Sequence, residues 1–177
     1  MNADFSCRLF NRLESLPYRW RRVTESFYEH EVCNLLQLSA FVGKELDDLV
    51  RALREPALVS RLCSFVGSPT ADVLALTGHR LYGGDRIDTH NDNSATGEVF
   101  RLLMFIDPHP RFSGGELLLQ EELTGEIITR VRVPYVPFQV YLFRFGPHCY
   151  HAVSPVETKV NGANRLTLLA TYGTEIS

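Results

Sequence analysis

Apolar residues in the amino-terminal part of the chain recur every three or four positions. The first such segment is 28–41 and the second is 44–65. This spacing places apolar side chains on one face of a helix. Pro56 interrupts the second segment and predicts a break or kink there, because proline cannot donate a backbone hydrogen bond. The residues that carry the pattern are Val32, Leu35, Leu36 and Phe41 in the first segment and Leu46, Leu49, Val50, Leu53, Leu58, Val59, Leu62 and Phe65 in the second.

After Gly67 and Pro69 the pattern changes to short strand-like segments separated by turn residues. Glycine, proline and aspartate gather between them, as in Gly83–Asp85 and Asp107–Pro110. Many short strands with frequent turns are typical of a β-sandwich or a jelly roll. The strands that we expect are 71–76, 86–90, 99–106, 116–120, 126–133, 139–145 and 165–172.

Together these patterns predict a mainly β fold with supporting α-helices. A chain of 177 residues agrees with one domain that buries its own core. We expect residues 1–70 to form a helical buttress and residues 71–177 to form the jelly-roll core. Five arginines lie between Arg8 and Arg22, and we interpret them as part of a solvated arm or a first strand.

Composition narrows the classes of function. The formal net charge is -3, so the chain lacks the basic character of a nucleic-acid-binding protein. No apolar stretch is long enough for a membrane span, and no signal peptide is recognisable at the amino terminus. The four cysteines have no Cys-x-x-Cys spacing and are interpreted as reduced thiols. These observations predict a cytoplasmic protein with no nucleic-acid or membrane partner.

The strongest chemical signal is the triplet His90-Asn91-Asp92. On an extended segment, residues two apart point to the same side, so His90 and Asp92 aim at one point. Two imidazoles and one carboxylate form the facial triad that holds non-haem Fe(II), and His151 is the candidate for the third ligand. His148 lies three residues earlier and stays an alternative. Taken alone, the triplet fits a polar surface turn better than a metal site.

Arg165 opens an apolar strand, where a buried charge needs a partner. One interpretation is a salt bridge at the end of a strand. The other is a clamp for a small dicarboxylate, because a guanidinium grips a carboxylate with two parallel hydrogen bonds. Tyr82 and Thr167 have hydroxyl groups that would add hydrogen bonds to the same carboxylate; taken alone, each fits an ordinary core or strand residue better.

Several motifs occur together, in order, between about Thr77 and Gly173. They are Leu81-Tyr82-Gly83-Gly84-Asp85, His90-Asn91-Asp92-Asn93, Arg101-Leu102-Leu103-Met104-Phe105-Ile106, Gly114-Gly115-Glu116-Leu117, Phe143-Arg144-Phe145, His151-Ala152-Val153 and Arg165-Leu166-Thr167. The set resembles the Fe(II)- and 2-oxoglutarate-dependent oxygenases, in particular their prolyl 4-hydroxylase-like branch.

The resemblance implies a double-stranded β-helix with His90, Asp92 and His151 on Fe(II). It also implies Arg165 on the distal carboxylate of 2-oxoglutarate, with Tyr82 and Thr167 as helpers and ascorbate as an accessory reductant. The co-substrates would be O2 and 2-oxoglutarate. The presence of Asp92 favours hydroxylation over halogenation, because halogenating members have a small residue there.

The expected reaction is hydroxylation of an unactivated C–H bond, first of all in a prolyl or other amino-acid side chain of a free amino acid, a peptide or a protein. A small natural-product intermediate is the alternative substrate. Two other classes stay open: a non-catalytic jelly-roll binding module, and a cupin-like metalloenzyme without 2-oxoglutarate. The residues that we expect to contact substrate are Asn91, Asn93, Arg101, Arg144 and the segment 107–112.

Overall fold

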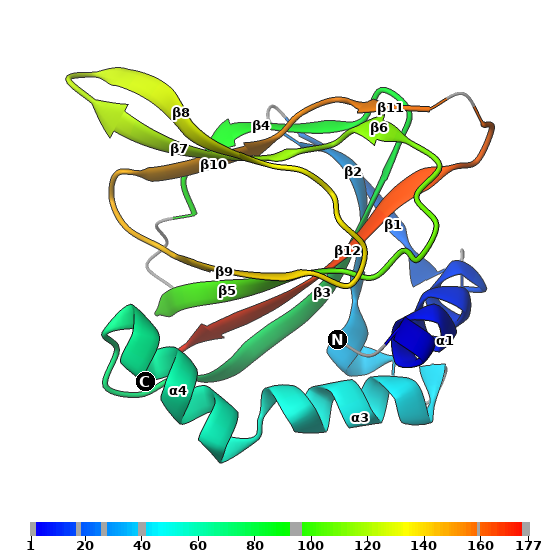
Figure 1. Cartoon of the computed structure of the whole chain (residues 1–177), viewed down its shortest axis with the longest axis horizontal. Coiled ribbons are helices and arrows are strands. Elements are labelled where there is room, and N and C mark those ends of the chain that lie inside the picture. The colour runs from blue at the N-terminus through cyan, green and yellow to red at the C-terminus, as the bar shows by residue number, and fades with distance from the viewer. Residues whose placement is uncertain are drawn as a thin grey trace.

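The computed structural model describes residues 3–16, 19–25, 28–38, 42–92, 97–158 and 160–174. The sheet forms an upper and a lower layer in Figure 1, and the helices lie below the lower layer. The helices are α1 (Ala3–Glu14), the 3-10 turn η2 (Leu35–Gln37), α3 (Lys44–Leu53) and α4 (Pro56–Val66). The strands are β1 (Arg21–Glu25), β2 (Tyr28–Asn34), β3 (Asp72–Tyr82), β4 (Arg86–His90), β5 (Glu98–Phe105), β6 (Ser113–Gly114), β7 (Leu117–Leu123), β8 (Glu126–Val133), β9 (Val140–Arg144), β10 (Cys149–Val153), β11 (Val156–Glu157) and β12 (Asn164–Gly173).

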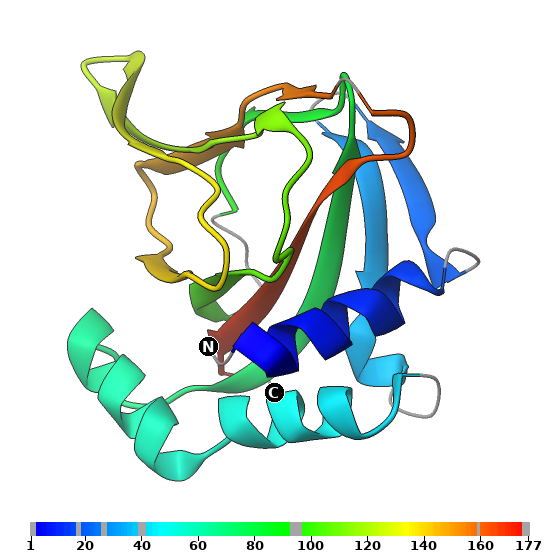
Figure 2. The same ribbon diagram turned by 45° about the vertical axis from the view of Figure 1, so that its right-hand side comes forward.

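Ten strands form one continuous, curled antiparallel sheet. Its order is β8-β7-β10-β4-β2-β3-β12-β5-β9, with β1 added beside β2. The curl places β4, β10 and β7 opposite β3, β12 and β5, as both views show (Figures 1 and 2). A short second sheet pairs β6 with β11. This architecture confirms the predicted mainly β, jelly-roll-like fold with supporting helices.

The segment 28–41 differs from the helical prediction. Residues 28–34 form strand β2, and only Leu35–Gln37 are helical; residues 39–41 lie outside the described part of the chain. β2 pairs with β3 through Glu31–Asn34 and with β4 through Tyr28 and Glu29. It therefore joins the two halves of the curl. The predicted helix is wrong because residues 28–34 pair as a strand with three neighbouring strands, β1, β3 and β4.

Four of the five amino-terminal arginines lie on two elements. Arg8 and Arg12 belong to helix α1, where we expected an arm or a strand, and Arg21 and Arg22 belong to strand β1. Helix α1 buries Leu9 and Leu13 in the main core, so the segment contributes to the packed structure.

The two helices of segment 44–65 agree with the prediction. α3 ends at Leu53 and α4 begins at Pro56. Proline is tolerated at this position, because the backbone N–H groups of the first helical turn have no partner within the helix in any case. Gly67 ends α4 in the left-handed conformation, with φ of 72°. Both helices pack under the sheet, and their buried side chains share one core with its outer face.

Strand β12 is buried on both faces. Leu166, Leu168, Ala170 and Tyr172 belong to the core between the sheet and the helices. The alternate residues Arg165, Thr167, Leu169 and Thr171 line a cavity inside the curl. Strand alternation thus separates a structural face from a face available for chemistry.

No helix in the described part of the chain is long and apolar enough to cross a membrane.

Candidate metal and co-substrate site

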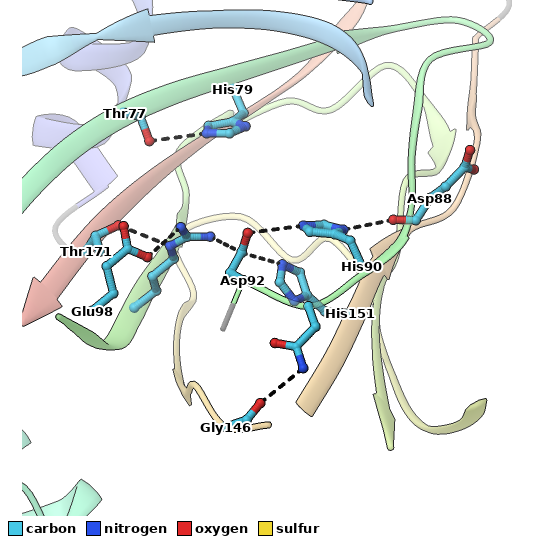
Figure 3. A network of polar contacts seen from close by, with 11 residues as sticks. Thr77, His79, Asp88, His90, Asp92, Glu98, Gly146, His151 and Thr171 are labelled. Atoms are coloured by element: carbon cyan, nitrogen blue, oxygen red, sulfur yellow. Dashed lines mark hydrogen bonds and ion pairs between the residues drawn. The ribbon is translucent and has the colours of Figure 1, made fainter. Parts of the chain in front are cut away.

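Three side chains meet at one end of the cavity. His90 ends β4, Asp92 follows two residues later, and His151 lies on the neighbouring β10, directly opposite His90 in the register. Each offers one ligand atom, and these atoms all lie within 4.8 Å of one another. The structure therefore brings together the three residues that the sequence nominated, and Figure 3 shows them facing a common point.

The triplet is fixed by contacts to the backbone. His90 Nδ1 lies 2.8 Å from the carbonyl oxygen of Asp88, which favours the tautomer that donates from Nδ1 and leaves Nε2 for a metal. Asn91 points away from the cluster, and its Nδ2 donates to the carbonyl oxygens of Pro147 (2.7 Å) and Gly146 (3.2 Å). The residue between the two ligands thus ties the triplet to the loop before β10.

The protonation states suit metal binding. Burial opposes ionisation of Asp92, but hydrogen bonds from His151 and His90, together with the charge of Arg101, outweigh it and hold the pKa of Asp92 well below its usual value. Burial lowers the pKa of His151, and its hydrogen bond to Asp92 opposes that shift. At neutral pH the cluster therefore holds a carboxylate and a neutral His151 imidazole, which are the forms that bind metal.

His148, the alternative ligand, does not belong to this cluster. Its side chain is 70% exposed, and its Nδ1 lies 3.5 Å from Glu122 Oε2. Among the described residues, the grouping with metal-ligand geometry contains His151 instead.

Arg165 lies in the same cavity as the three candidate ligands. The residue is 1% exposed, its Nε donates to the carbonyl oxygen of Gly115 at 2.6 Å, and its Nη1 lies 3.4 Å from Thr167 Oγ1. Among the described residues, Nη2 is buried without a hydrogen-bond partner, and no carboxylate forms an ion pair with Arg165. Burial lowers the pKa of Arg165 to about 10, so the group still carries its charge at neutral pH.

The Gly114-Gly115 pair makes room for this arginine. Gly115 has φ of 64°, and a Cβ there would lie 2.6 Å from Arg165 Cδ. Gly114 has φ of 67°, and a Cβ there would lie 2.2 Å from the carbonyl oxygen of Pro155. Both positions need glycine for two reasons, the left-handed conformation and the close approach of another group.

Thr167 and Tyr82 differ in their placement. Thr167 faces the cavity beside Arg165, as expected. Tyr82 does not, because Ala75, Thr77 and His79 are the β3 residues that line the cavity and Tyr82 has the opposite parity. Its ring packs instead on the Arg80 guanidinium, at 5.4 Å. The prediction that Tyr82 contacts the co-substrate disagrees with this geometry.

Of the residues predicted to contact substrate, the structure places some in the cavity and others outside it. Arg101 lines the cavity and forms an ion pair with Asp92. Arg144 is exposed on β9, whereas its neighbour Phe143 faces the cavity. Four residues of the segment 107–112 line a separate hollow beside α1, and Asn93 lies outside the described residues.

Sequence reasoning missed three polar side chains near the site. Tyr135 lies beside Arg165, with the guanidinium carbon 5.7 Å from its ring centroid, and its Oη donates to the carbonyl oxygen of Leu166. His30 and His79 stack at 4.9 Å on the cavity wall. Alternation along β3 would have identified His79, but no local signal points to Tyr135, which comes from the segment between β8 and β9.

The residues fit the groups that the resemblance implies. Two imidazoles and one carboxylate match non-haem Fe(II), with no cysteine in the cluster to favour zinc. The buried Nη2 of Arg165 is an unsatisfied donor, as an anionic ligand requires. The cavity has a volume of about 390 Å³, which is large enough for a small organic ligand.

Comparison with known proteins identifies the fold. No protein-family model matches the sequence, and no curated protein matches it. Among solved structures, a Pseudomonas putida prolyl-4-hydroxylase is similar over 98% of this chain and 86% of its own, with 16% identity and a TM-score of 0.67. A Trichoplax adhaerens prolyl hydroxylase, solved with a hypoxia inducible factor peptide fragment, is similar over 96% and 78%, with 16% identity and a TM-score of 0.69. A Burkholderia pseudomallei oxidoreductase of the 2OG-Fe(II) oxygenase family covers 97% and 90%, with 13% identity and a TM-score of 0.63.

Proposed function

We propose that this protein is an Fe(II)- and 2-oxoglutarate-dependent dioxygenase that hydroxylates an unactivated C–H bond. His90, Asp92 and His151 would hold the iron, and Arg165 with Thr167 would hold the distal carboxylate of 2-oxoglutarate. Iron bound there would supply the redox chemistry that couples decarboxylation of the co-substrate to hydroxylation. Ascorbate is a candidate accessory reductant.

One observation carries this proposal: a fully buried guanidinium, with no counter-ion among the described residues, shares a cavity with a metal-ligand cluster. Burying an unpaired charge is costly, and a protein keeps one where a ligand of opposite charge completes the site. A cupin-like metalloenzyme that uses no dicarboxylate would not need Arg165. A non-catalytic binding module would need neither Arg165 nor the cluster.

The protein groups have separable tasks. His90 and His151 present neutral ring nitrogens, and Asp92 supplies the negative charge that a divalent cation requires. The guanidinium of Arg165 orients the co-substrate with its two-pronged geometry. Apolar side chains, among them Leu103, Leu117 and Leu169, line the space between these groups and exclude water from it.

For the substrate, we propose a prolyl or other amino-acid side chain, with a small natural-product intermediate as the alternative. Similarity in fold to two prolyl hydroxylases, one of them bound to a peptide, supports the first choice. A cytoplasmic setting belongs to the same proposal and is supported by the four free cysteine thiols.

The test is turnover of 2-oxoglutarate. The protein is loaded with Fe(II) without oxygen, then mixed with oxygen, 2-oxoglutarate and candidate substrates, and succinate is measured. We expect a substrate to stimulate succinate formation. His90→Ala and Asp92→Ala should abolish it, and Arg165→Ala should raise the KM for 2-oxoglutarate at least tenfold, the loss expected for one charge-assisted contact of about 1.4 kcal/mol or more.

The matched control is Arg130→Gln. It removes an exposed guanidinium paired with Glu121 on the β7–β8 hairpin, outside the cavity. Unchanged Fe(II) affinity in His90→Ala and Asp92→Ala would contradict the metal assignment. An unchanged 2-oxoglutarate requirement in Arg165→Ala would contradict the clamp.

A further inference from the structure

Arg101 is the cation closest to the candidate iron site. It lies on β5, opposite Thr171 in the register with β12, and its side chain is 17% exposed. Its Nη1 donates to Oδ2 of Asp92. A metal-ligand carboxylate thus has a guanidinium on one of its two oxygens.

Three further contacts fix the guanidinium itself. Nη2 lies 3.1 Å from Glu98 Oε2, Nε donates to Thr171 Oγ1 at 3.1 Å, and the plane packs 4.7 Å from the Phe145 ring centroid. The three residues that bind the guanidinium, Asp92, Glu98 and Thr171, are labelled in Figure 3. Each edge of the guanidinium has a partner and one face has a ring, so its position is determined before any ligand binds.

The charges of Asp92, Arg101 and Glu98 alternate in sign, and this arrangement suits metal binding. A guanidinium that had only Asp92 as its partner would cancel the negative charge that a divalent cation needs. Glu98 supplies a second carboxylate, so Asp92, Arg101 and Glu98 together keep one net negative charge. Arg101 can therefore hold Asp92 in place while the three side chains together keep the negative charge that attracts a metal cation.

We propose that Arg101 is a positioning residue for Asp92 and that Glu98 offsets its charge. The inference rests on the proposed function, because it takes Asp92 as a metal ligand. Arg101 acts through Asp92, by restricting the rotation of the carboxylate that follows the end of β4. Groups that orient metal ligands in this way typically change metal affinity or activity 10- to 100-fold when they are removed.

The experiment is a titration with Co(II), a redox-stable substitute for Fe(II), followed by the visible absorption of the bound ion. We expect Arg101→Gln to weaken Co(II) binding about 10- to 100-fold and to alter the absorption bands. Arg101→Lys keeps the charge but loses the planar guanidinium. Its Co(II) affinity should therefore lie between that of the parent protein and that of Arg101→Gln. Arg130→Gln, the control, should match the parent protein.

Glu98→Gln separates charge from position. It leaves the Arg101 charge uncancelled beside Asp92, so we expect weaker Co(II) binding in the parent background. In the Arg101→Gln background the same substitution should add little, because Glu98 acts through Arg101. Parent-like affinity with an unchanged spectrum in Arg101→Gln would overturn the proposal, as would a Glu98→Gln effect that persists without Arg101.

Two controls keep the outcomes distinct. Thermal unfolding of the metal-free variants identifies any general loss of structure, and if Arg101→Gln fails to fold, Arg101→Lys and Glu98→Gln carry the test. Co(II) binding that His90→Ala abolishes would support the metal site whatever Arg101 does. A parent protein that binds no Co(II) would overturn both the metal site and the positioning role.

Discussion

Gly115 shows how a residue without a side chain can determine a binding site. A methyl group there would lie 2.6 Å from Arg165 Cδ and 3.1 Å from Val156 Cγ2. We expect Gly115→Ala to displace Arg165 and raise the KM for 2-oxoglutarate at least tenfold, with a smaller effect on Co(II) affinity, because the metal ligands lie on other strands.

The control for this prediction is Gly125→Ala in the turn between β7 and β8. Gly125 also has a positive φ, of 83°, but a Cβ there meets nothing within 4 Å. The backbone strain of the substitution is therefore similar at the two positions, but only the Gly115 variant has a steric clash with Arg165. Equal KM values for the two alanine variants would contradict the prediction.

His30 is one of the buried rings that make the stability of the protein depend on acid pH. Its two ring nitrogens are buried and have no hydrogen-bond partner in the part of the chain that the structure describes. Burial lowers its pKa from 6.5 to about 4, with Arg22, Arg165 and His90 adding to the shift and Asp85 opposing it. The unfolded chain takes up the proton first as pH falls. The stability tied to neutral His30 is therefore full above about pH 6.5 and is lost between pH 6.5 and about 4, by up to about 3 kcal/mol.

Urea unfolding of metal-free protein at several pH values measures this effect. His30→Phe should show a smaller loss of free energy of unfolding between pH 6.5 and 4 than the parent protein. His148→Gln, at an exposed position, should behave as the parent does. The same slope in all three proteins would contradict the role of His30.

For single residues, the sequence predicts the site well where the position of a side chain depends only on residues close to it in the chain. Strand alternation places His90 and Asp92 on one side, and the structure agrees. It does not reveal which face of β3 turns inward, so Tyr82 was assigned to the cavity although Thr77 and His79 occupy that face. Tyr135 reaches Arg165 from a distant segment, which no local pattern indicates.

At the scale of elements, Tyr172 connects the sheet to the helices. Its ring stacks on Phe100 at 4.6 Å, and its Oη donates to the carbonyl oxygen of Leu53, the last residue of α3, at 2.8 Å. Burial of this end of the helix makes the bond more valuable than it would be in water.

We expect Tyr172→Phe to lower the free energy of unfolding by about 1–3 kcal/mol, because it leaves the buried carbonyl oxygen of Leu53 without its donor. Denaturant unfolding measures the change. Tyr150→Phe removes a part-exposed bond to Glu122 and should cost less. A Tyr172→Phe variant as stable as the parent would show that water satisfies this carbonyl.

Strand β2 explains why element prediction failed in one place. It has polar as well as apolar side chains on its inward face, where Tyr28, His30 and Val32 line the cavity. The alternation that marks a half-buried strand is therefore hidden. Val32 also makes a helix-like i, i+3, i+4 spacing with Leu35 and Leu36, which lie beyond the end of the strand. The helices at 44–65 have no such polar inward face and were predicted correctly.

At the scale of the whole molecule, ligand binding should couple to stability. The metal cluster joins β4 to β10, and Arg165 lies on β12, so occupied sites would connect both halves of the curl. Ligands that bind only the folded state stabilise it by about 2.7 kcal/mol at 100 times their Kd.

We expect Co(II) to raise the melting temperature and 2-oxoglutarate to raise it further. In Arg165→Ala the second increment should disappear and the first should remain, as differential scanning fluorimetry would show. If 2-oxoglutarate raised the melting temperature without metal, and did so equally in Arg165→Ala, the arrangement of the site would be contradicted.

The mainly β architecture could be predicted from the spacing of strands and turns, and each of the seven expected strands overlaps a strand of the structure. The curl could not, because it depends on β2 pairing with both β3 and β4 at once. The cavity volume depends in turn on that closure, which involves residues far apart in the sequence.

The central position of β12 has a consequence for how the protein is made. It is the last strand that the structure describes, yet it lies between β3 and β5 in the sheet. A nascent chain synthesised only as far as Gly162 would leave both of those strands with an unpaired edge and an open apolar face. Such edges pair readily with other chains. The protein therefore passes through a vulnerable interval during synthesis, which ends only when residues 164–173 insert between strands made much earlier.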